Sequence, residues 1–439
     1  MIRTLTRISN LPVGVRQAGI FASALALSKG VSFLMVPITT RYLSPEDFGR
    51  LDILQTLADV VSLFIAFGLA DTLFRYAGAA HSEEDRKASA ANIFSIALVI
   101  GAVALILGQI GAPVVAGLLP GNVSLSDVRL ILGSLAYSGI ILVPLGWLRM
   151  QDRTWAYFAG SAGRTVAQAG LAATLLSLGF GVTGFLVAGF LTATVLAVVV
   201  SVLMIRDVGL RFDWLKNPLY AAYGAPLVLA GLAGFVLGSL DRWILAGSVG
   251  AAQMADYALA AKFGLMTAIA IQPFDMYWLP KRFQVLKAEN GEKRAARMAL
   301  FGVGVACLAA CGVALAGPVV LKLITPDVYH GAAQYVPWLA LLAALHATTT
   351  LLNLGCLTGD SSRRLMIVDG GAAAVALVGY LTLIPGFGAW GAIVATGLAL
   401  SLRLITTVVW AQRAHSLPYD FVRMGLMGAG AVGVVWMPV

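Results

Sequence analysis

The feature that most constrains this chain is a succession of long apolar segments separated by short polar breaks. An α-helix needs about 20 apolar residues to cross the hydrocarbon core of a bilayer. We expect twelve such helices, at 19–43, 48–70, 92–118, 128–148, 157–179, 182–205, 222–246, 254–280, 298–321, 334–355, 365–384 and 388–411. The sequence therefore predicts an all-α integral membrane protein.

The composition argues against a soluble protein. Hydrophobic residues make up 59% of the 439 positions and charged residues only 12%, whereas soluble domains carry about 25% charged residues. The chain has no P-loop, no HExxH motif and no GxSxG turn between a strand and a helix. Its four histidines and three cysteines lack metal-binding spacing. We therefore expect no catalytic residues, no metal site and no cofactor.

The two ends of the chain raise separate questions. The first apolar run, residues 20–40, is long enough to cross the membrane and leads to no small-residue cleavage site. We expect a retained first helix there, because a signal peptide has a shorter apolar region and a cleavage site. The last apolar run, 422–439, has only 18 residues. The sequence leaves open whether this run is a thirteenth span or a tail.

The positions of Lys and Arg predict the orientation of the helices. Basic residues concentrate in the breaks on the N-terminal side, which include Arg3, Arg7 and the long breaks at 206–221 and 281–297. The basic residues of the opposite side are Arg41, Arg50, Arg129 and Lys322. Cytoplasmic loops carry the excess of Lys and Arg, so we expect a cytoplasmic N-terminus. Topology thus explains the net charge of +9, and we expect no nucleic-acid partner.

The basic break at 206–221 lies between the sixth and seventh predicted spans. Transporters are often built from two repeated halves with a site between them. We therefore expect an N-terminal six-helix lobe at 1–210, a C-terminal six-helix lobe at 211–414 and a tail or extra span at 415–439. A weak internal repeat, which aligns 43–54 with 249–260, supports this division.

Four basic residues lie well inside predicted spans, and they are the candidate site. They are Lys29, Arg164, Lys262 and Arg403. Lys29 lies about ten residues into its helix, or about 15 Å deep, and Asp59 lies at a similar depth in the next span. Charges at this depth are costly and usually face a cavity or a partner. An excess of cations over Asp59 predicts a cavity that receives an anion, for which Arg and Lys are suitable ligands.

Simpler interpretations of these charges remain open. Lys29 and Asp59 could form a purely structural ion pair between adjacent helices. Asp71 and Arg75 are spaced i, i+4 near the end of a span, which is typical of a local pair on one helix face. The side chains of Lys262 and Arg403 could extend along their helices to the membrane interface.

Three stretches of the sequence resemble a known family. The segments SKGVSFLMVPITTRYLSPEDFGRLDIL (28–54) and GLADTLFRYAG (68–78) are similar to the opening of the Wzx-type polysaccharide biosynthesis flippases. These proteins belong to the multidrug/oligosaccharidyl-lipid/polysaccharide (MOP) exporter superfamily. The segment 241–263 resembles the family's turn between its seventh and eighth helices, with Tyr257 and Lys262, although Asp256 replaces a family glycine. The resemblance implies two six-helix lobes around a central cavity.

The resemblance also implies a function. Members of this family move a polyprenyl-pyrophosphate-linked oligosaccharide from the cytoplasmic to the periplasmic leaflet of the bacterial inner membrane by alternating access, for O-antigen or exopolysaccharide synthesis. The chain would then be a transporter in the lipid bilayer and not an enzyme. The four membrane cations would bind the pyrophosphate, and Asp59, Asp71 and Arg75 would serve in coupling or ion pairing. Coupling to H⁺ or Na⁺, and work beside a polysaccharide polymerase complex, stay open.

Two other functions stay open at this point. A cation-coupled multidrug or small-molecule exporter could use the same fold, although cationic drugs require an acidic cavity. A membrane glycan polymerase would need a large extramembrane loop, whereas the outer loops at 119–127 and 324–335 are short.

Overall fold

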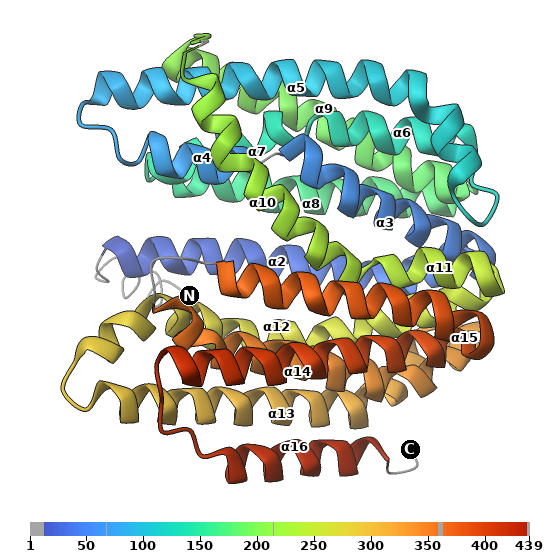
Figure 1. Cartoon of the computed structure of the whole chain (residues 1–439). Coiled ribbons are helices and arrows are strands. Elements are labelled where there is room, and N and C mark those ends of the chain that lie inside the picture. The colour runs from blue at the N-terminus through green and yellow to red at the C-terminus, as the bar shows by residue number, and fades with distance from the viewer. Residues whose placement is uncertain (1–12, 67, 214, 359–362, 437–439) are drawn as a thin grey trace, which may run out of the picture. The chain divides into compact units, whose positions relative to one another are not determined.

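The structure is a computed structural model that describes residues 13–66, 68–213, 215–358 and 363–436. Helices account for nearly all of this described part, which contains no strand (Figure 1). The predicted all-α class is confirmed. Arg3 and Arg7, used above to predict orientation, and the last three residues of the apolar run 422–439 lie outside the described residues.

The chain divides into two compact units, Met1–Leu232 and Ala233–Val439. The division falls inside one helix, α10 (Asn217–Gly238), and not at residue 210. That boundary was drawn from the count of spans on each side, and the assignment of six spans to each half stays a prediction.

The first unit contains eight helices before α10 in its described part. They are α2 (Val13–Tyr42), α3 (Pro45–Ala66), α4 (Leu69–Tyr76), α5 (Glu83–Leu118), α6 (Leu125–Ala136), α7 (Ser138–Met150), α8 (Thr154–Ser177) and α9 (Gly181–Val208). Helix α2 packs mainly against α8, and α8 packs in turn against α9. Buried side chains from α4, α5 and α7, including Leu73, Phe94 and Trp147, form the main core of this unit.

The second unit begins within α10 and continues through long helices and two short 3₁₀ segments. They are α11 (Leu240–Val249), α12 (Ala251–Lys287), α13 (Gly291–Ile324), η1 (Asp327–Tyr335), α14 (Val336–Leu352), η2 (Asn353–Leu357), α15 (Arg363–Ala414) and α16 (Phe421–Val435). Helices α12, α13 and α14 pack against one another. The core of this unit includes Trp278 of α12, Leu351 of α14 and Tyr419, which precedes α16.

Ten helical segments of the described chain are long and apolar enough to cross a membrane. One of these, Arg364–Ala414, contains two predicted spans, 365–384 and 388–411. Helix α8 holds the predicted span 157–179 but is not among the ten, and its sequence mixes Gly, Ser, Thr, Gln and Arg164 into an apolar run. The multi-pass membrane class is confirmed, while the number of twelve crossings stays a prediction.

Three predicted spans, 48–70, 128–148 and 222–246, are each divided between two α-helices. The first breaks between α3 and α4, where Gly68 has a φ of 63° in the left-handed region that favours glycine. A Cβ atom on Gly68 would lie 2.8 Å from Leu227 Cδ1 of α10, so the Leu227 side chain would have to move. The span 128–148 breaks at Tyr137, between α6 and α7, and the span 222–246 breaks at Ser239, between α10 and α11. Each of these spans is thus formed by two helices, and Pro45–Tyr76 and Leu125–Met150 are still long and apolar enough to cross a membrane.

Helix α15 is a helical hairpin. At Gly388 the φ and ψ angles are 56° and −132°, a conformation that glycine adopts far more readily than other residues. The chain then returns antiparallel, so that the Tyr380 hydroxyl lies 2.9 Å from Thr396 Oγ1. A Cβ on Gly379 would lie 2.7 Å from the Ala395 Cβ of the opposite limb. Small residues thus allow the two limbs to approach closely.

The hairpin predicts a difference between two glycines of the same limb. Gly379→Ala should lower the melting temperature of the purified protein in detergent, because overpacking costs about 1–3 kcal/mol. Gly371→Ala is the matched control, since a Cβ there has no neighbour within 4 Å and alanine favours a helix by about 0.5–1 kcal/mol. Equal melting temperatures for the two variants would contradict the close packing of the limbs.

Candidate functional site

Two of the predicted site residues lie on neighbouring helices of the first unit. Lys29 is exposed on α2, and Arg164 is half-buried on α8. Their neighbours in sequence connect the two helices. The hydroxyl of Thr165, which follows Arg164, donates a hydrogen bond across 3.4 Å to Oγ of Ser28, which precedes Lys29. Since α2 packs along α8, the two cations lie at the same level of this helix pair. The structure therefore brings Lys29 and Arg164 into one region.

The Arg164 guanidinium has unused hydrogen-bonding capacity. Its Nε atom is buried and has no hydrogen-bond partner among the described residues. Leaving a buried charged donor without an acceptor costs free energy that a bound acceptor would recover. A phosphate oxygen is a suitable acceptor, because guanidinium–phosphate hydrogen bonds are charge-assisted. This donor makes the α2–α8 region suitable for an anionic ligand.

The second unit holds the other two predicted cations in a different arrangement. Lys262 is half-buried on α12, beside the buried ring of Phe263. Arg403, on the second limb of α15, donates from Nε to Asp369 Oδ1 of the first limb across 2.7 Å. Its Nη1 also lies 3.2 Å from His346 Nδ1 of α14. Arg403 is therefore neutralised by a carboxylate.

The Arg403–Asp369 ion pair changes the count of charges inside the predicted spans. Only Asp59 was set against the four cations above, and Asp369 was not counted. Asp369 lies near the start of the predicted span 365–384, where it was not counted against a cation. The hairpin turn at Gly388 brings residues 369 and 403 side by side, since they are almost symmetrical about the turn. A sequence signal for this pairing exists in the Pro-Gly-Phe-Gly segment 385–388, which marks the turn.

The predicted coupling residues are placed as follows. Asp59 is exposed on α3, and Asp71 and Arg75 are exposed in the first and last turns of α4. The Arg75 guanidinium lies 4.7 Å from the centre of the Tyr223 ring of α10, within the range of a cation–π interaction. The coupling and ion-pair roles of these three residues stay predictions.

A further arginine lies buried at the end of α12. Arg282, assigned above to the basic break 281–297, has only 9% of its surface exposed. It donates to Asn353 Oδ1 of η2 across 2.9 Å. Burial lowers the pKa of the Arg282 guanidinium, and the nearby Tyr419 hydroxyl acts in the opposite direction. Burial also raises the pKa of the Tyr419 hydroxyl. Arg282 therefore stabilises helix ends within the second unit in addition to contributing charge.

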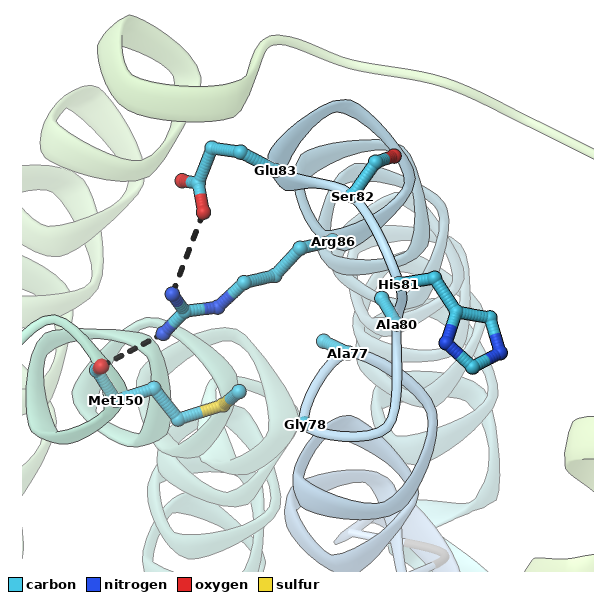
Figure 2. A pocket seen from close by; sticks show the side chains of 8 residues that line it. All are labelled: Ala77, Gly78, Ala80, His81, Ser82, Glu83, Arg86 and Met150. Carbon is cyan, nitrogen blue, oxygen red and sulfur yellow. Dashed lines mark hydrogen bonds and ion pairs between the residues drawn. The ribbon is translucent and has the colours of Figure 1, made fainter.

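A pocket of about 390 Å³ lies at the turn between α4 and α5 (Figure 2). Arg86 lines this pocket. Its guanidinium donates a hydrogen bond to the Met150 carbonyl oxygen across 2.7 Å and lies 3.3 Å from the Glu83 carboxylate. The same guanidinium lies 5.3 Å from the Trp147 ring centre. Because its charge is already satisfied by protein groups, Arg86 joins helix ends and is not available as an anion ligand.

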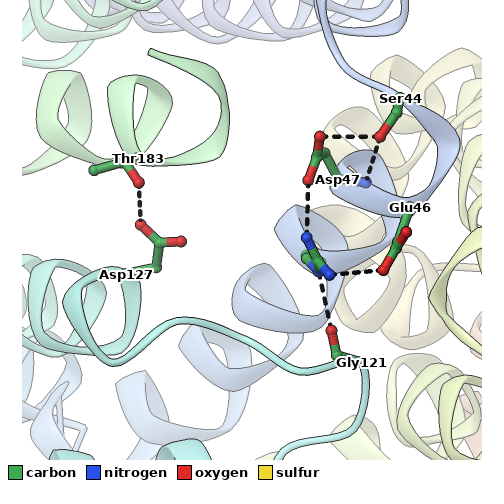
Figure 3. Close-up of polar contacts among 7 residues, drawn as sticks. Ser44, Glu46, Asp47, Gly121, Asp127 and Thr183 are labelled. Atoms are coloured by element: carbon green, nitrogen blue, oxygen red, sulfur yellow. Dashed lines mark hydrogen bonds and ion pairs between the residues drawn. The ribbon is translucent and has the colours of Figure 1, made fainter.

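The motif that carries the family resemblance, RYLSPEDFG, organises the start of α3 (Figure 3). Ser44 accepts a hydrogen bond from the Asp47 amide across 3.2 Å, which caps the helix. Arg50 lies 2.6 Å from Glu46 and 3.2 Å from Asp47, and its Nε donates to the Gly121 carbonyl across 3.0 Å. The motif therefore fixes a helix start and a neighbouring loop, and its polar groups have a structural role.

This role predicts a specific loss of stability. Ser44→Ala removes the cap of α3 and should cost about 1 kcal/mol of unfolding free energy. The matched control on the same helix is Ser62→Ala, because the Ser62 hydroxyl only donates to the Asp59 carbonyl within the helix. Melting in detergent should shift downward for the first variant and remain near wild type for the second. A larger shift for the control would overturn the capping role.

Comparison with protein families gives one match, over residues 15–284, to the family described as "Polysaccharide biosynthesis protein". The matched stretch is more than half of the chain, and it includes α3 to α11 and most of α2 and α12. No curated protein sequence matches the chain significantly.

Solved structures share its fold. A lipid II flippase, MurJ, in an inward closed conformation has a TM-score of 0.71 at 8% identity, covering 96% of this chain and 92% of that chain. A MOP superfamily transporter from Pyrococcus furiosus, described as having a binding pocket of reverse polarity, has a TM-score of 0.58 at 16% identity, covering 94% and 96%. An inward-facing MATE-family multidrug resistance transporter has a TM-score of 0.55 at 16% identity, covering 92% and 98%. The MOP resemblance is confirmed, and at these identities the likeness concerns the fold alone.

Proposed function

This chain belongs to the polysaccharide biosynthesis protein family, and we propose that it is a flippase for a lipid-linked oligosaccharide. The cargo is a glycan on a polyprenyl pyrophosphate, which moves from the cytoplasmic to the periplasmic leaflet of a bacterial inner membrane for surface polysaccharide assembly. The N-terminus lies in the cytoplasm. The protein moves this molecule without making or breaking its bonds, so it is a transporter and not an enzyme.

The observation that carries this proposal is the placement of two cations on packed helices of the first unit. Lys29 and Arg164 lie at one level of the α2–α8 helix pair, and the Arg164 Nε is buried with no partner among the residues described. A pyrophosphate supplies several anionic oxygens that both side chains can bind, Arg by directional hydrogen bonds and Lys as a compact charge. The fold shared with a lipid II flippase also supports the proposal.

The remaining predicted residues enter the proposed cycle as follows. Lys262 and Arg403 bind the head group from the second unit, and the prenyl tail stays in the lipid. Asp59 pairs with Lys29 when the head group has left, which avoids an uncompensated cation at bilayer depth. Asp71 and Arg75 act in the same coupling at α4. Alternating access of the two lobes, driven with H⁺ or Na⁺, then exposes the glycan on the other side, where a polysaccharide polymerase complex accepts it.

The test is transport of a fluorescently labelled polyprenyl-pyrophosphate glycan by the full-length protein in reconstituted vesicles. Lys29→Ala and Arg164→Ala should each slow flipping about tenfold or more, because loss of a charge-assisted contact costs about 1.4 kcal/mol or more. Lys87→Ala is the matched control, since this exposed lysine near the start of α5 lies outside the predicted spans.

Each outcome has a clear meaning. Wild-type rates in both Lys29→Ala and Arg164→Ala would refute the anion site. Thermal stabilisation of the protein by organic cations and not by pyrophosphate lipids would replace the flippase with a drug exporter. Formation of new glycosidic bonds from a labelled donor would replace it with a glycan polymerase.

A further inference from the structure

Three side chains of the second unit form a connected polar cluster inside the membrane-spanning segments. Arg403 donates to Asp369 across 2.7 Å and contacts His346 Nδ1 across 3.2 Å. Arg403 has 13% of its side chain exposed and Asp369 has 34%. At 1.5 Å per residue, Asp369 and His346 lie about 9 Å from the nearer ends of their helices, and Arg403 about 16 Å. The cluster therefore lies within apolar helices, where an unpaired guanidinium would be costly.

The His346 contact is a hydrogen bond only for a neutral imidazole. A guanidinium can only donate, so Nδ1 is then the acceptor and the ring proton is on Nε2. Protonation at Nδ1 would remove the acceptor and place two positive charges about 3 Å apart. The charged groups that act on His346 are Arg403 and Asp369. Among the described residues, the Arg403 guanidinium thus has Asp369 and His346 as its side-chain partners.

We propose that Asp369 is an internal counterion that occupies Arg403 until the anionic head group of the lipid-linked substrate displaces its carboxylate, and that neutral His346 positions the guanidinium for this exchange. The proposal rests on the proposed function and deepens it. Asp369 and His346 are positioning residues, since each acts through Arg403. Carboxylate and phosphate oxygens compete for the same donors, so only one of them binds at a time.

The exchange accounts for two needs of a transporter that must also release its cargo. After the head group leaves, Asp369 neutralises a cation that would be costly alone at bilayer depth. Before it arrives, the same carboxylate lowers the apparent affinity, because the binding-competent form is only a fraction of the protein. Return of Asp369 therefore favours release of the head group without a separate energy source at this site.

The test measures binding of farnesyl pyrophosphate to the full-length protein in detergent, with farnesol as the probe that lacks the anion. Asp369→Asn should bind farnesyl pyrophosphate about tenfold more tightly than wild type, because it removes the competing charge. Arg403→Gln should bind it about tenfold more weakly. In an Arg403→Gln background, Asp369→Asn should have no further effect. Asp207→Asn is the matched control, since it removes a carboxylate paired with Arg153 elsewhere in the protein.

A purely structural ion pair gives a different result. Asp369→Asn would then melt at a lower temperature and bind the probe no more tightly than wild type, which would overturn the proposal. Asp369→Glu keeps the charge and should bind like wild type; tighter binding by this variant would also overturn it.

The pH dependence gives a second, independent readout that does not need an Asp369 variant to fold. Between pH 6.5 and pH 5, wild-type affinity for farnesyl pyrophosphate should rise more than that of His346→Gln, because protonation of His346 releases Arg403 and adds positive charge. Ionisation of the probe itself affects both proteins equally. Identical pH profiles would overturn the role of His346.

Failure of this inference differs from failure of the proposed function. If wild type does not distinguish farnesyl pyrophosphate from farnesol, the flippase proposal fails and this inference fails with it. If wild type does distinguish them, Lys29→Ala weakens binding and Asp369→Asn does not tighten it, then only the counterion exchange is wrong.

Discussion

The structure depends on the cost of placing charge and unpaired polar groups in a medium that has no water. Every backbone amide in the hydrocarbon must bond within the protein, and each ionised side chain there needs a partner or a hydrated cavity. The first requirement produces the long helices and the tight α15 hairpin. The second explains why Arg403 is held by Asp369 and why the buried Nε of Arg164 is suited to a ligand.

The two units solve the same charge problem in different ways. In the first unit, Lys29 and Arg164 lie on adjacent helices, and Arg164 keeps a donor without an acceptor. In the second unit, Arg403 has a carboxylate of its own. An anionic head group would complete the hydrogen bonding of the first arrangement and would have to compete for the second. This difference suits a transporter that binds its cargo and then lets it go.

The sequence predicted the fold class and most helices because length and apolarity alone set the requirement for crossing a bilayer. It also predicted spans at 48–70, 128–148 and 222–246, and the structure divides each of them between two helices, at Gly68, Tyr137 and Ser239. Hydropathy averaged over a window does not detect a break of one or two residues. The Lys29 and Arg164 neighbourhood was predicted only as a shared cavity, because spacing along the chain does not reveal which helices pack.

The sequence by itself determined that this chain is a multi-pass helical membrane protein of a polysaccharide biosynthesis family, since apolar length and a nine-residue capping motif are local properties. Only the tertiary structure decided which charges are neutralised. Asp369 and Arg403 are 34 residues apart, and they meet because Gly388 reverses the chain and small residues allow the limbs to touch. Charge compensation depends on distances of a few ångströms, which folding sets and sequence order does not.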